Sequence, residues 1–220
     1  DVIVVVHVIP AVVPAHLALL RAAGAGRRTA SGHGPRTILI AHNVLPHESH
    51  PGARQLVELL VERVDAVVVH SDEQARLATT LGAHHVRQLD LPPHLPGGDP
   101  EPRVANDADT ASTPVRVLAL GIVRDYKGVD LLVDAVRDVP GIHLTIAGEL
   151  WGDAGRTVRD LANDPRVAGR VELHPGYVPA DRIAGLLAQH DVMALTYRTA
   201  TASQNVLLAH KHGLPVLATT

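Results

Sequence analysis

Short runs of aliphatic and β-branched residues alternate along this chain with segments of helical periodicity, and this alternation constrains the fold most. Most of the runs are almost wholly apolar, which is typical of strands that are covered on both faces. The candidate strands are Val2–Val8, Thr37–Ala41, Ala66–His70, Val86–Leu89, Val115–Leu120, His143–Ala147, Val171–His174, Val192–Leu195 and Val216–Ala218. Strand-helix alternation implies right-handed crossovers, so the sequence predicts an α/β fold with parallel sheets.

The segments between these runs carry apolar residues at helical spacing. The expected helices are Arg54–Val64, a helix that begins after Ser71, and then Val129–Val136, Thr157–Asn163, Asp181–His190 and Ser203–His212. The S-x-x-Q run from Ser71 to Gln74 predicts a capping box at the start of its helix.

One stretch interrupts the alternation. Residues 91–114 are rich in Pro, Gly, Asp and Thr and show no apolar periodicity, which is typical of a linker. We therefore predict two Rossmann-like domains, one in residues 1–90 and one in residues 115–220, separated by this linker. The sequence begins on a strand without a start methionine and ends shortly after another, so we expect both domains to be truncated.

Composition excludes several classes of protein. The net charge is -3 and aromatic residues make up 2% of the chain, which argues against nucleic-acid binding. The chain has no cysteine, which excludes disulfides and thiolate metal sites and favours a cytoplasmic setting. No apolar run reaches the roughly 18 residues of a membrane helix.

Cationic and hydroxyl residues follow two of the predicted strands, where ligands of open α/β sheets bind. Arg124 offers a planar fork for phosphate oxygens, and Lys127 offers a mobile point charge. The helix that begins near Ser203 offers free backbone N–H groups and the positive end of its dipole. Together these groups would form a diphosphate site. Solvated turn cations beside a simple helix cap at Ser203 would give the same pattern.

Two other chemistries are disfavoured. The first strand lacks the G-x-G-x-x-G turn of nicotinamide dehydrogenases. His42, His47, Glu48 and His50 lie close in sequence, but no helix places them on one face and no cysteine supplements them. We therefore predict no metal site.

Several motifs, in this order and spacing, resemble a known family over most of the chain outside the linker. They are V-L-A-L-G-I-V-R-D-Y-K-G-V-D-L-L, I-A-G-E, G-Y-V-P, H-D-V-M-A-L-T-Y-R-T-A-T-A-S and H-G-L-P-V-L-A-T in the second half, with A-H-N-V-L-P-H-E and D-A-V-V-V-H-S-D-E in the first. The sequence resembles the family-four retaining glycosyltransferases, which have the GT-B fold of two Rossmann-like domains.

The resemblance implies transfer of a hexose from a nucleotide-diphosphate sugar, as substrate, with retention of configuration and without a cofactor or metal. It assigns the leaving diphosphate to Arg124 and Lys127, and the region beside donor sugar and acceptor to His42. The resemblance also places Val178 at the donor, and the turns at the strand ends add Gly121, Gly128, Glu149, Thr201 and Ser203 as donor-binding candidates. On the acceptor side, His47 and Glu48 would fix their loop or touch the acceptor. Glu149 would equally serve as a surface residue, and Arg198 would either face the site or pair with an acid.

The sequence departs from the family at two places. Counting back from Gly213, Ala200 and Leu208 stand where much of the family carries two glutamates, and Thr201 and Ser203 are the substitutes that we predict. Two alternatives to the transferase therefore stay open, namely a catalytically degenerate protein that binds nucleotide sugar or acts as a partner subunit, and a nucleotide-sugar epimerase. The expected acceptor is a saccharide, a lipid-linked or a small hydroxyl compound. A peripheral membrane contact of the acceptor-side domain is also expected.

Overall fold

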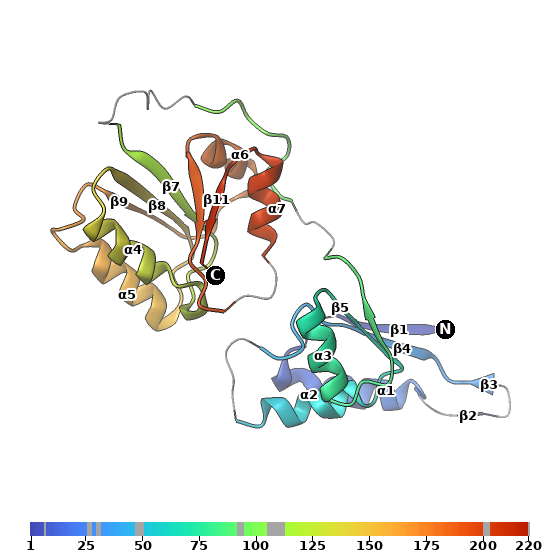
Figure 1. The fold of residues 1–220 in the computed structure, drawn as a ribbon. Helices are drawn as coiled ribbons and strands as arrows, with labels where there is room; N and C mark the ends of the chain where they lie inside the picture. The colour runs from blue at the N-terminus through green and yellow to red at the C-terminus, as the bar shows by residue number, and fades with distance from the viewer. Residues whose placement is uncertain are drawn as a thin grey trace. The chain divides into compact units, whose positions relative to one another are not determined.

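The computed structural model describes residues 1–6, 8–25, 28–29, 32–46, 51–91, 95–104, 113–199 and 203–219. Within them the chain forms two compact units, Asp1–Pro92 and Pro93–Thr220. Figure 1 draws both as layered α/β structures, blue to green for the first and green to red for the second.

The first unit is built on a parallel sheet in the order β1-β4-β5-β6. Its strands are β1 (Val2–Val6), β4 (Arg36–Ile40), β5 (Ala66–Val69) and β6 (Val86–Gln88). Its helices are the 3-10 turn η1 (Pro10–Val12), α1 (Val13–Ala22), α2 (Ala53–Val61) and α3 (Asp72–Thr80), and a short antiparallel ribbon joins β2 (Arg28–Thr29) to β3 (Gly32–His33). Leu20, Leu39 and Leu60 are fully buried in the core between sheet and helices.

The second unit is built on a parallel sheet in the order β11-β10-β7-β8-β9. Its strands are β7 (Val115–Leu120), β8 (Ile142–Gly148), β9 (Val171–Pro175), β10 (Val192–Leu195) and β11 (Val216–Ala218). The helical elements are η2 (Asp125–Lys127), α4 (Val129–Asp138), α5 (Gly152–Ala162), α6 (Ala180–Ala188) and α7 (Gln204–Lys211).

Alternate residues of β7 point into two separate cores in this unit. Val117 packs with Val133 of α4 and Val158 of α5, whereas Leu118 packs with Leu187 of α6 and with α7. The strand order reverses between β7 and β10, since β8 and β9 follow on one side of β7 and β10 and β11 on the other. This reversal is the topological switch point at which ligands of doubly wound sheets bind.

The predicted α/β class with parallel sheets is confirmed, and each of the nine predicted strands is present. The sequence prediction missed α1 and the β2–β3 ribbon. The helix predicted from Thr157 begins earlier, at Gly152. One expectation about burial is wrong for β1, because Val2, Val4 and Val6 are 59, 49 and 53% exposed among the residues that the structure describes.

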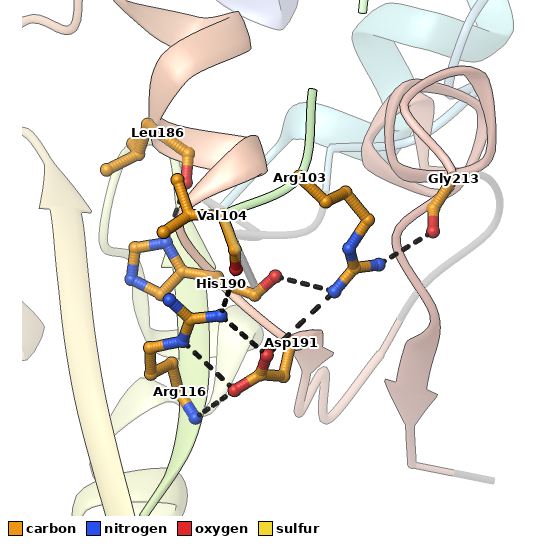
Figure 2. Close-up of polar contacts among 7 residues, drawn as sticks. All are labelled: Arg103, Val104, Arg116, Leu186, His190, Asp191 and Gly213. Carbon is orange, nitrogen blue, oxygen red and sulfur yellow. Dashed lines mark hydrogen bonds and ion pairs between the residues drawn. The ribbon is translucent and has the colours of Figure 1, made fainter. Parts of the chain in front are cut away.

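Residues 95–104, part of the predicted linker, pack along α6 of the second unit. Arg103 donates hydrogen bonds to the carbonyls of Gly213 and His190, at 2.9 Å each. Arg116 of β7 binds both oxygens of Asp191 and the carbonyl of Val104 (Figure 2). This segment, which we call the strap, is therefore held to the sheet by two arginines around one carboxylate.

Candidate functional site

Three turns meet at the carboxyl ends of β7, β8 and β10. After β7, the backbone N–H of Gly121 donates to Ala147, and that of Val123 donates to Glu149, both at 2.8 Å. The turn after β10 joins them, since the Thr196 hydroxyl donates to the Gly128 carbonyl at 2.9 Å. The predicted residues Gly121, Gly128 and Glu149 are therefore brought together here.

Two glycines permit this close approach of backbones. Gly128 has a φ of +58°, and a Cβ there would lie 2.1 Å from the Thr196 carbonyl oxygen. Gly148 has a φ of +150°, and a Cβ there would lie 2.1 Å from the Gly121 carbonyl oxygen. Any side chain at either position would force the turns apart.

Lys127 lies partly buried between these turns. Its Nζ is 5.9 Å from the centroid of the Tyr197 ring, and it lines a small hollow with Gly121 and Thr196. Burial lowers the pKa of Lys127, and the nearby positive charge of Arg124 lowers it further. Both causes disfavour the charged amine, and a bound anion would offset both.

Arg124 lies at the start of η2, in the same turn. Its guanidinium carbon lies 4.6 Å from the centroid of the Trp151 ring, a cation–π arrangement. Trp151 precedes α5 and is the single tryptophan of the chain. Trp151 is not among the residues predicted from the sequence, although a lone tryptophan two residues beyond Glu149 is a signal that could identify it.

The first turn of α7 faces the same switch point. Asn205 donates from Nδ2 to the Leu120 carbonyl at 2.9 Å, which ties α7 to the end of β7. Ser203 occupies the N-cap position, but its side chain makes no capping hydrogen bond. Instead its hydroxyl lies 3.2 Å from the Tyr197 hydroxyl, whose pKa is raised by burial. The simple-cap alternative for the Ser203 side chain is therefore not supported.

The Arg198 side chain is engaged by an acidic residue of the same unit. Its guanidinium pairs with both oxygens of Asp130, at 2.9 and 2.5 Å, and donates to the Asp125 carbonyl. Of the two alternatives that the sequence left open, the structure supports the ion pair.

Val178 lines a cavity of about 520 Å³ at the carboxyl end of β9. The same cavity is bordered by Tyr177 and by Ala147, so it begins at the end of β8 and continues along α6. Glu149 is half-buried near the β8 end, and its carboxylate makes no hydrogen bond with residues that the structure describes.

His42 belongs to the first unit, directly after β4. Its ring lies 5.0 Å from that of His70, which follows β5, with the two planes tilted by 31°. His70 is held through Nδ1 by the Leu89 carbonyl at 3.0 Å. The predicted capping box is half present, because Ser71 accepts from the Gln74 N–H while the Gln74 side chain accepts from Val44 instead.

Some predicted residues lie outside the described part of the chain. They are His47, Glu48, His50, Ala200 and Thr201. Leu208 is described and lies in the core of the second unit at 3% exposure. Among the residues placed, no three histidine or acidic side chains are grouped to hold a metal ion. No described helix is long and apolar enough to cross a membrane.

Comparisons with known proteins match this architecture. Residues 114–220 match the family described as glycosyl transferases group 1. A curated relative from Xanthomonas campestris pv. campestris, named GDP-mannose:glycolipid 4-beta-D-mannosyltransferase, is 32% identical over 113 residues, or 50% of this chain and 31% of the relative. The chain thus spans about a third of the length of that relative.

Solved structures match the chain from end to end at low identity. Sucrose-phosphate synthase from Thermosynechococcus elongatus matches 99% of this chain and 55% of its own, with a TM-score of 0.75 and 15% identity. Anabaena HepE in complex with UDP-glucose matches 98% of this chain and 59% of its own, with a TM-score of 0.73 and 14% identity. The chain therefore has the fold of the GT-B glycosyltransferases, and most of its second unit matches glycosyl transferases group 1.

Proposed function

We propose that this protein transfers a sugar from a nucleotide-diphosphate donor to a hydroxyl acceptor, with retention of configuration. The observation that carries the proposal is the pair Arg124 and Lys127 at the switch point, beside the first turn of α7. The match of residues 114–220 to glycosyl transferases group 1 supports the same class of reaction.

The cations would act on the charge that develops as the donor breaks. The bond from the anomeric carbon to the diphosphate oxygen is cleaved, and the acceptor oxygen forms the new bond to that carbon. The acceptor proton passes to the leaving phosphate, whose negative charge Lys127 and Arg124 neutralise. Fixed charges aimed at a developing anion in a water-poor site are among the strongest contributions to catalysis.

Retention is proposed from the resemblance to the retaining family, and because the placed carboxylates offer no evident nucleophile, the acceptor would attack from the same face that the diphosphate leaves. Asp125 lies within the cationic turn and its side chain is 86% exposed, whereas both oxygens of Asp130, the next acid along the chain, are bound by Arg198. The stereochemistry is measurable from the product. The Xanthomonas relative is named for a β-linked product, so NMR of the anomeric configuration decides this part of the proposal. A β-linked product from an α-linked donor would contradict retention.

We also propose roles for residues of the first unit near the acceptor, and we propose that no metal is required. His42 would orient the donor sugar or the acceptor, with His47 and Glu48 on the acceptor side. The proposed acceptor is a saccharide or lipid-linked hydroxyl. The name of the Xanthomonas relative, which includes a glycolipid, is consistent with this acceptor. Because two side-chain cations already serve the diphosphate, we propose that turnover needs no metal and survives chelation. A cytoplasmic site, peripheral to a membrane, stays a prediction.

The test is nucleoside diphosphate release by the full-length protein from a panel of nucleotide sugars. We expect Arg124→Ala and Lys127→Ala each to lower kcat/KM at least a hundredfold, as is typical when one charge-stabilising group is removed. Arg159→Ala, an exposed arginine on α5, is the matched control and should leave turnover unchanged. Equal loss in all three variants, or none in the two site variants, would refute the proposal.

A second candidate is a protein that binds nucleotide sugar without turning it over. The burial of Leu208 favours it, because an apolar core residue stands where the resemblance leads us to expect a ligand-facing glutamate. Donor binding without release of nucleoside diphosphate, with every acceptor class supplied, would select this candidate.

A further inference from the structure

The cavity at Val178 has two distinct ends. One end is made by the turn after β9, through the exposed residues Gly176 and Pro179. The other end runs along α6, where Arg182, Gly185, Leu186 and Gln189 line it from one face of the helix. At about 520 Å³ the cavity is large enough for a purine nucleoside.

A carboxylate of the strap reaches this cavity. Glu101 lines it, although it precedes the sheet of the second unit in sequence. Its Oε2 lies 3.2 Å from the place where a Cβ on Gly185 would stand, so the absent side chain leaves room for the carboxylate against α6. Glu101 is exposed, and its carboxylate makes no hydrogen bond or ion pair with the residues that the structure describes.

The strap that carries Glu101 is fixed on both sides of it. Lys211 donates to the Gly98 carbonyl, and Val104 donates its N–H to the Ala188 carbonyl at 2.9 Å. Arg103 adds the two hydrogen bonds drawn in Figure 2. The backbone that presents Glu101 is therefore held in place before a ligand binds, which lowers the entropy cost of recognition.

An exposed aromatic ring stands at the other end of the cavity. Tyr177 is 77% exposed, the highest value among the large apolar and aromatic side chains that the structure describes as exposed. It lines the cavity from the turn after β9. Rings in such a position stack on nucleic-acid bases, and each stack contributes about 1–3 kcal/mol.

Carboxylate chemistry selects among the bases. Guanine presents two adjacent donors, N1–H and the exocyclic amine, which match the two oxygens of one carboxylate. Uracil presents a single N–H between two carbonyl oxygens, which a carboxylate repels. Adenine presents one amine beside a ring acceptor. An ionised carboxylate only accepts hydrogen bonds, so it binds a base with two adjacent donors and repels a base that presents carbonyl oxygens.

We propose that this cavity binds the guanine base of a GDP-sugar donor, with Glu101 accepting from N1–H and the exocyclic amine and Tyr177 stacking on the ring. This inference rests on the proposed donor function and narrows it to one nucleotide. Glu101 becomes the specificity-determining residue, contributed by the strap. The name of the Xanthomonas relative includes GDP-mannose, a donor that carries the same base.

The test is a set of binding titrations of the full-length protein with GDP, IDP and UDP. IDP differs from GDP only by lacking the exocyclic amine. We expect GDP to bind at least about tenfold more tightly than IDP, because the IDP complex lacks one hydrogen bond to the charged carboxylate. In Glu101→Gln, which keeps a single acceptor oxygen, GDP affinity should fall roughly tenfold and the preference over IDP should disappear.

Matched variants separate this role from general effects. Asp181→Asn removes a carboxylate from the same cavity and should keep the preference of GDP over IDP. Tyr177→Ala should weaken GDP and IDP alike, because both carry the same fused ring. Tight UDP binding, or an unchanged preference in Glu101→Gln, would overturn the inference while leaving the donor function intact. Failure to bind any nucleoside diphosphate would instead overturn the donor function itself.

Discussion

Lys127 is a charge held where a charge is disfavoured. It lies partly buried beside Tyr197, and the charge of another cation, Arg124, acts on it. Burial of the amine and a neighbouring like charge both disfavour its charged form, and a bound anion would offset both. Perturbed lysines in such hollows are candidates for function on this ground.

The lowered pKa of Lys127 predicts a pH dependence of diphosphate binding. The amine is charged below its pKa, so affinity should be constant at lower pH and fall as pH rises through that pKa. Because the pKa lies below the ordinary 10.5, the fall should begin at a lower pH than for an exposed lysine. Titration of nucleoside diphosphate affinity against pH measures it.

Lys127→Arg is the control for this pH dependence. Arginine stays charged throughout the range, so the variant should lose the fall in affinity that belongs to the lysine, while the titration of the ligand itself remains. Identical pH profiles for the two proteins would show that Lys127 does not contact the diphosphate.

The sequence predicted which strand ends these residues follow, but not the side chains with which they pair. Arg124, Lys127 and the start of α7 were placed together because strand ends of one parallel sheet share an edge. The partner of Arg198 was not predictable from the sequence. Asp125 lies before α4 and Asp130 in its first turn, 73 and 68 positions away from Arg198. Such pairings depend on side-chain reach across turns, which periodicity does not report.

At the scale of elements, the turns of the second unit contain glycines with the same backbone angle but different steric surroundings. Gly128 and Gly152 share a φ of +58°, but a Cβ would meet the Thr196 carbonyl at 2.1 Å in the first and open space in the second. The backbone strain of a substitution is therefore the same at both, and the steric clash is confined to Gly128.

This pair predicts two different losses of stability. Gly152→Ala should lower the free energy of unfolding by about 1 kcal/mol, the cost of a left-handed alanine. Gly128→Ala should lower it by about 3 kcal/mol or more, because the turns after β7 and β10 must separate. Denaturant unfolding measures both values. Equal losses would show that the close contact between Gly128 and Thr196 is not maintained in solution.

The elements that the sequence analysis missed share a physical cause. Most of the nine predicted strands are apolar runs of three residues or more. The two-residue strands β2 and β3 are too short to show a period. Helix α1 reads V-P-A-H-L-A-L-L-R-A, so apolar residues surround it nearly on all sides and its buried face does not stand out.

At the scale of the whole molecule, each unit has its own apolar core. Leu39 belongs to the core of the first unit and Leu144 to one of the two cores of the second, and both are fully buried. Neither cluster includes residues of the other unit. The proposed donor groups Arg124, Lys127 and Glu101 all lie within the second unit.

Separate cores predict separate unfolding. Leu39→Ala should lower the free energy of unfolding of the first unit alone, and Leu144→Ala that of the second alone, each by about 2–5 kcal/mol for a buried leucine. GDP at about a hundred times its dissociation constant should raise only the second transition, by about 2.7 kcal/mol. Scanning calorimetry of the full-length protein resolves the transitions. A single transition that both variants lower equally would show instead that the two cores unfold as one cooperative structure, and the donor groups would then depend on the first unit for their stability.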